Sequence, residues 1–109
     1  ATRFQWGVEY VEGLIRMHPH DGAVIAGTAA ALLPELDSPR DALTGRNFGR
    51  LQTLLKAING WWEGRSIDPD SGRILGDFYD ELRGLCQSSE SDSVTGHNCS
   101  VLQELQVRG

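Results

Sequence analysis

Apolar side chains recur every three or four residues along much of this chain. The clearest run has spacings of three, four, three and four, and it consists of Phe48, Leu51, Leu55, Ile58 and Trp62. Such spacing places side chains on one face of an α-helix, whereas a half-buried strand needs strict alternation. It is also typical of helices that pack together in antiparallel bundles. The sequence therefore predicts an all-α fold.

Three more segments carry an apolar stripe with helical spacing. We expect helices from about residue 3 to 17, from residue 22 to about 33 and from residue 69 to about 87. Asp21 and Asp68 precede the last two, where an aspartate side chain can accept hydrogen bonds from the first backbone N–H groups. In the first helix we expect a buried stripe formed by Phe4, Val8, Val11 and Ile15, widened by Tyr10 and Leu14. With the run described above, these segments make four main helices.

The connection before the clearest helix also carries boundary signals. Ser38 followed by Pro39 is a cap with proline at the first helical position, which predicts a short helix ending near Thr44. Gly45 is expected to break that helix. Asn47 is then expected to cap the helix that follows.

The chain divides into a helical part and a polar tail. Residues 1–87 are expected to form a small antiparallel bundle of about four main helices. Residues 88–109 are expected to form a polar loop and a short final segment that packs on the same domain. The final segment fits a helical turn better than a strand, because strict alternation of apolar and polar residues is absent.

The charge balance bears on the partners of this protein. Acidic residues outnumber basic ones by 15 to 10, which gives a net charge of −5. Domains that bind nucleic acids usually carry a basic patch, so we expect no nucleic-acid partner. No apolar run approaches the roughly 18 residues that span a bilayer, so we expect no membrane partner either. These features favour a cytoplasmic location.

The two cysteines leave that location open. Cys86 and Cys99 are 13 positions apart and could close a loop with a disulfide. Two reduced thiols in a cytosolic protein fit the sequence equally well. A bridge between them would instead indicate an extracytoplasmic protein.

His18 and His20 flank Pro19 and are the candidate metal ligands in this sequence. A complete site needs three or four ligands, and the sequence does not identify a third. The segment from Asp68 to Asp70 resembles a calcium loop only superficially, because the glycine at the sixth position and the glutamate at the twelfth are missing. We therefore expect no bound metal and no cofactor.

No arrangement of residues in the sequence indicates catalysis. Asp77, Asp80 and Glu81 share a helix face, but paired carboxylates do acid–base work only where burial separates their pKa values. We expect this acidic face to be solvated. A nucleophilic Cys86 would need a base, and His97 lies eleven residues away across the polar loop. The sequence thus favours a protein that is not an enzyme.

Tryptophans are the candidate partner-binding residues. Trp61 and Trp62 are adjacent, so their side chains leave the helix about 100° apart. Trp62 continues the apolar stripe, Trp61 lies to one side of it, and Trp6 lies off the best stripe of the first helix. Exposed tryptophan is enriched at the energetic centres of protein interfaces. All three are therefore expected to bind a partner, and the alternative is that they are covered within the monomer.

These observations favour a non-catalytic helical module for protein–protein interaction, of the regulator, adaptor or inhibitor type. Its partner would be another protein, itself, or both, and a homodimer is expected because small domains with surplus apolar faces often self-associate. The alternative is a small enzyme, or a ligand or metal binder, with its site between helices.

Overall fold

The computed structural model describes residues 2–35, 45–63 and 68–88 together with residues 98 and 100. Four α-helices and one 3-10 turn lie within this part of the chain. They are α1 (Thr2–Met17), α2 (Gly22–Leu32), η1 (Leu33–Glu35), α4 (Gly45–Glu63) and α5 (Pro69–Ser88). The predicted all-α fold is confirmed. The short helix expected to end near residue 44 lies outside the described residues, as does nearly all of the predicted tail.

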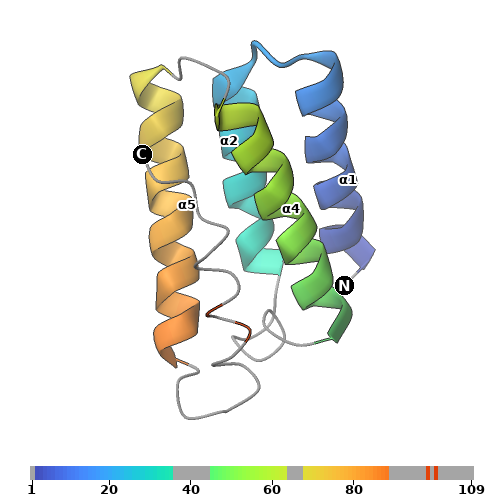
Figure 1. The fold of residues 1–109 in the computed structure, drawn as a ribbon, viewed down its shortest axis with the longest axis vertical. Coiled ribbons are helices and arrows are strands. Elements are labelled where there is room, and N and C mark those ends of the chain that lie inside the picture. Colours follow the sequence, from blue (N-terminus) through green and yellow to red (C-terminus); the bar gives the residue numbers. More distant parts are fainter. Residues whose placement is uncertain (1, 36–44, 64–67, 89–97, 99, 101–109) are drawn as a thin grey trace.

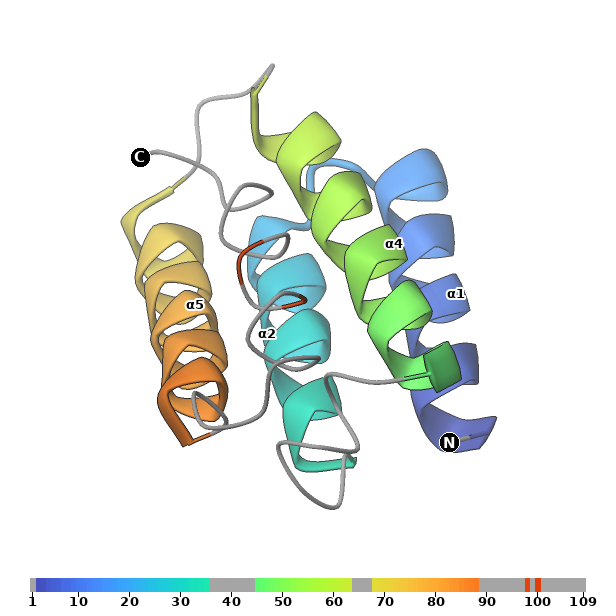
Figure 2. The same ribbon diagram turned by 60° about the horizontal axis from the view of Figure 1, so that its bottom comes forward.

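The four helices form a bundle whose long axes run roughly side by side (Figure 1). Helix α1 packs against α2 and α4, and α2 also packs against α5. Helices that follow one another in sequence run in opposite directions, whereas the packed pairs α1 with α4 and α2 with α5 run in the same direction (Figures 1 and 2). The predicted bundle is therefore confirmed, with two parallel pairs among its neighbours.

All four helices contribute to one apolar core. The stripes expected from the sequence supply most of it, because burying them together removes the largest apolar area from water. The largest side chains that are fully buried are Phe4, Val11, Ile25, Leu51, Leu54, Leu55, Ile58, Leu75, Phe78 and Leu82. None of the helices that the structure describes combines the length and the apolar character needed to cross a membrane.

Side-chain contacts join α4 to α5. The Trp62 and Tyr79 rings stack with centroids 6.3 Å apart and an interplanar angle of 14°. The Tyr79 hydroxyl donates a hydrogen bond of 3.1 Å to Oδ1 of Asn59. Tyr79 is itself buried. The stack and the hydrogen bond therefore tie the last turns of α4 to the middle of α5.

The predicted helix caps were right in one case and need correction in two. Asp68 caps α5, because its carboxylate accepts hydrogen bonds from the backbone N–H of Ser71 (3.1 Å) and from the Ser71 hydroxyl (2.6 Å). Asp21 precedes α2 as expected, but its side chain makes no capping hydrogen bond. The prediction for Asn47 was wrong, since α4 already begins at Gly45 and Asn47 is buried within its first turn.

Two glycines allow helices to approach closely. A Cβ atom on Gly7 would come within 3.0 Å of Cδ2 of Leu32, so the missing side chain lets Leu32 of α2 lie across α1. A Cβ atom on Gly22 would lie 2.8 Å from the Ser71 hydroxyl oxygen, at the point where the first turns of α2 and α5 meet. Glycine at these two positions therefore sets how tightly α2 fits between α1 and α5.

Candidate docking face

Trp61 is a component of the fold. Only 5% of its surface is exposed, and its indole N–H donates a hydrogen bond of 2.9 Å to the carbonyl oxygen of Pro19. A buried indole usually finds such an acceptor, because leaving the N–H without one would cost its desolvation free energy. The bond links the end of α4 to the turn between α1 and α2. Trp61 is thus covered within the monomer.

Trp62 is half-buried, and one face of its ring is taken by the stack on Tyr79. Phe78 meets Tyr79 edge to face, with centroids 5.4 Å apart, so the three rings form a row that leads from the surface into the core. Aromatic pairs in these geometries contribute about 0.5–1.5 kcal/mol beyond area burial. The main contact of Trp62 is therefore inside the bundle.

Trp6 is the tryptophan that remains largely exposed, at 65%. Two more large apolar side chains on α1 are exposed as well, Tyr10 at 59% and Met17 at 69%. The fourth such residue in the described part of the chain is Val24 of α2, at 50%. Helix α1 therefore carries most of the exposed bulky apolar surface that the structure describes.

These exposed residues form a second stripe along α1. Trp6, Tyr10, Gly13 and Met17 are separated by four, three and four residues, and at about 100° per residue they fall within roughly 60° of one another around the helix axis. We call this set the outer stripe. It lies nearly opposite the buried stripe that contains Phe4 and Val11. The expectation that Tyr10 would widen the buried stripe was therefore wrong.

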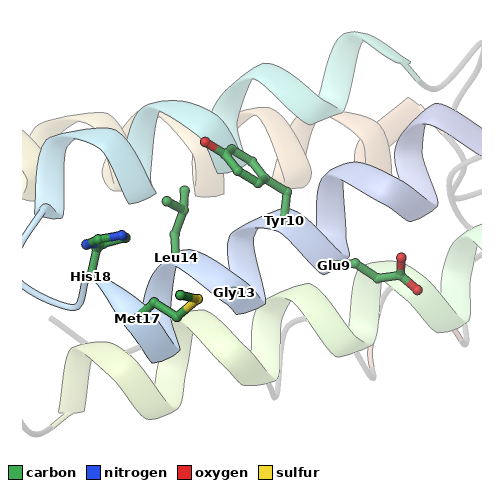
Figure 3. Close-up of a pocket in the computed structure, with 6 residues that line it drawn as sticks. All are labelled: Glu9, Tyr10, Gly13, Leu14, Met17 and His18. Carbon is green, nitrogen blue, oxygen red and sulfur yellow. The ribbon is translucent and has the colours of Figure 1, made fainter.

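A shallow hollow of about 330 Å³ runs along this side of α1. Figure 3 shows its lining residues in two rows, with Glu9, Gly13 and Met17 in one and Tyr10, Leu14 and His18 in the other. Gly13 lies in the middle and has no side chain to fill the space. A Cβ atom built there would meet nothing within 4 Å. The hollow is therefore a notch in the surface of a single helix, and a side chain of another molecule could fill it.

The chemistry of this hollow suits docking better than catalysis. Its carboxylate, Glu9, and its imidazole, His18, lie at the two ends and are nine residues apart. Nine residues of α-helix correspond to about 13–14 Å along the axis, far beyond the hydrogen-bond reach that an acid–base pair needs. The remaining lining offers an aromatic ring, a thioether and a leucine, which are contact groups.

Charged groups flank the outer stripe on the side that faces α4. Glu9 and Arg16 are both exposed there. Nearby, Arg50 of α4 donates a hydrogen bond of 2.8 Å to Oε1 of Gln5, which helps to hold α1 against α4. The outer stripe thus has an apolar centre and a charged edge, the usual arrangement in protein interfaces.

The histidines proposed as metal ligands lie in and beside the turn between α1 and α2. His18 and His20 are both exposed. The backbone of His18 is used by the turn, since its N–H donates to the carbonyl of Leu14 (2.7 Å) and its carbonyl accepts from the N–H of Asp21 (3.1 Å). Among the residues that the structure describes, no three His, Cys, Asp or Glu side chains gather closely enough to hold a metal ion.

The acidic residues of α5 face outward, as predicted. Asp77, Asp80 and Glu81 are exposed, and Asp80 forms an ion pair with Arg83 in the next turn.

Cys86 of the same helix is buried. The structure describes no free cysteine, but Cys99 lies outside the described residues, so a bridge and two reduced thiols both stay hypotheses.

The outer stripe was only partly predicted from the sequence. Trp6 was expected at a binding surface, whereas Tyr10 was assigned to the core and Met17 to no surface at all. The signal that could have revealed the stripe is the second four–three–four spacing in the same helix.

No protein-family model, curated protein sequence or solved structure matches this chain. Its function must therefore be inferred from its own side chains.

Proposed function

We propose that this chain is a non-catalytic helical module for protein–protein interaction, and that it docks through the outer stripe of α1. The observation that carries the proposal is the row of exposed Trp6, Tyr10 and Met17 along one side of a helix that is anchored in the bundle by its opposite side. Exposed apolar surface that is contiguous and edged by charges is typical of binding sites. A helix held rigid by a core also presents its side chains with little loss of entropy on binding.

The size of the effect follows from the exposed area. Burying an aromatic side chain removes about 150–250 Å² from water, and the exposed 65% of Trp6 therefore offers roughly 100–160 Å². At about 25 cal/mol per Å², covering it contributes about 2.5–4 kcal/mol before the cost of association. Trp and Tyr are also the residue types most enriched at interface hot spots. Trp6 and Tyr10 are thus expected to dominate binding.

The charge of the chain supports a protein partner. With 15 acidic and 10 basic residues, the chain offers no overall attraction for nucleic acid. We retain the cytoplasm as the expected location unless Cys86 and Cys99 prove to be bridged.

Site-specific photo-crosslinking in the cells that make this protein tests the proposal. A photoreactive phenylalanine analogue would replace Tyr10, and in a matched control it would replace Asp77, which is exposed on α5. We expect discrete covalent adducts from position 10 and none from position 77, with the attached protein identified by mass spectrometry. The absence of adducts at position 10, or the same adducts at both positions, would contradict the proposal.

A further inference from the structure

We propose that the outer stripe binds a second copy of this chain, with the two α1 helices packed antiparallel across a twofold axis. This inference rests on the proposed function, since it assigns an occupant to the same docking face. The four residues of the outer stripe are separated by four, three and four residues, and this order of spacings is the same in both directions along the helix. Reversing one copy therefore brings position 6 opposite position 17, and position 10 opposite position 13.

In this register the side chains are complementary in size. The bulky ring of Tyr10 meets the notch at Gly13 of the second copy, where an added Cβ atom would meet nothing within 4 Å. Trp6 meets Met17, and a thioether next to an aromatic ring is a favourable contact. Each contact occurs twice because the arrangement is symmetric, so the assembly closes at two copies. A parallel arrangement would instead place Trp6 against Trp6 and would leave both notches unfilled.

The charged edge is complementary in the same register. A twofold axis perpendicular to both helices brings the edge that carries Glu9 and Arg16 against the same edge of the second copy. With the axis between positions 11 and 12, Glu9 of one copy lies only about 3 Å along the helix from Arg16 of the other. Both side chains are exposed and long enough to close that offset. Two intermolecular ion pairs therefore border the apolar centre.

The available area indicates how tightly such a dimer would hold. From the exposed 65% of Trp6 and 59% of Tyr10, the two rings together offer roughly 200–300 Å² per copy. Met17, the backbone at Gly13 and the stems of the charged residues add to this. The rings supply roughly 400–600 Å² over both copies, so the total lies at or below the low end of specific interfaces, about 1,200 Å². We therefore expect a reversible dimer with a Kd in the micromolar range.

Sedimentation velocity of the full chain, from micromolar to millimolar concentration, tests the dimer. We expect the wild type to pass from monomer to dimer. Gly13→Leu, which fills the notch and whose Cβ would meet no more distant part of its own chain within 4 Å, should weaken the dimer at least about tenfold. Gly76→Leu is the matched control, because a Cβ atom at Gly76 also meets nothing within 4 Å, but Gly76 lies on α5. That variant should dimerise as the wild type does.

A charge exchange tests the register. Glu9→Arg alone should weaken the dimer, because it replaces each of the two intermolecular ion pairs by a pair of arginines. The double variant Glu9→Arg, Arg16→Glu should restore it, because the pairs are re-formed with opposite sign. Circular dichroism of every variant checks that the bundle is intact. A wild type that stays monomeric at millimolar concentration, a Gly13→Leu variant that dimerises normally, or a double variant that is not restored would each overturn the inference. Crosslinks from position 10 to a different protein would still leave the proposed function standing.

Discussion

Replacing Gly7 by alanine is expected to cost stability although alanine is the better helix former. The new Cβ would come within 3.0 Å of Cδ2 of Leu32, with Cγ and Cδ1 of the same side chain at 3.2 Å. Leu32 belongs to the core, with 8% of its surface exposed, so a shift of its methyl groups acts against the packing of that core. Overpacking of this kind costs about 1–3 kcal/mol. The gain in helix propensity from glycine to alanine, about 1 kcal/mol, opposes this cost.

A second substitution isolates the overpacking cost. Gly76→Ala makes the same chemical change inside α5, where the new Cβ meets nothing within 4 Å. It should stabilise the protein by about 1 kcal/mol through propensity alone. The gain in helix propensity is the same in both variants, so it cancels when their free energies of unfolding are compared. The free energy of unfolding of Gly7→Ala should therefore lie about 1–3 kcal/mol below that of Gly76→Ala.

Urea unfolding followed by circular dichroism at 222 nm measures this difference, at a protein concentration low enough to keep the chain monomeric. The contact with Leu32 is tested by repeating Gly7→Ala in a Leu32→Ala background, where the substitution should turn stabilising because the obstructing methyl groups are gone. Equal stability of Gly7→Ala and Gly76→Ala, or the same penalty with and without the Leu32 side chain, would refute the packing argument.

Three further predictions concern single contacts. Trp61→Phe keeps an aromatic ring but removes the hydrogen bond to the Pro19 carbonyl, and urea unfolding should show a loss of about 0.5–1.5 kcal/mol or more; an unchanged midpoint would contradict a role for that bond. The hydrogen bonds donated to Asp68 at the start of α5 hold the pKa of its carboxyl below the ordinary value. Its contribution to stability should be complete above about pH 4 and decline as the pH falls through the lowered pKa, whereas Asp68→Asn should show no such decline in that range. Finally, if Cys86 and Cys99 are bridged, alkylation of the protein unfolded in urea without reductant should modify neither, and the detection of two modified thiols by mass spectrometry would exclude the bridge.

The helices and the main buried stripes could be predicted because they follow from local spacing. Val8, Val11, Leu55 and Ile58 were expected to be buried from their positions in the sequence alone, and all four are. A spacing of three or four residues places side chains on one side of a helix whatever surrounds it. The cap at Asp68 is equally local, because it involves a residue only three positions away.

The candidate site could not be predicted in the same way. Two apolar stripes exist on α1, and the sequence assigned Tyr10 to the buried one, whereas the structure leaves it 59% exposed. Trp61 could have been a surface anchor, but the turn at Pro19 covers it. Which stripe is covered depends on where the neighbouring helices lie, and that is set by distant contacts such as Leu32 across Gly7.

The sequence by itself thus determined that the backbone forms α-helices, where most of these helices begin and end, and which residues could line a core. Only the tertiary structure decided which of the two stripes on α1 meets the other helices and which meets water. The physical reason is that helical spacing constrains side chains within one helix, whereas burial is a relation between helices and depends on how they pack.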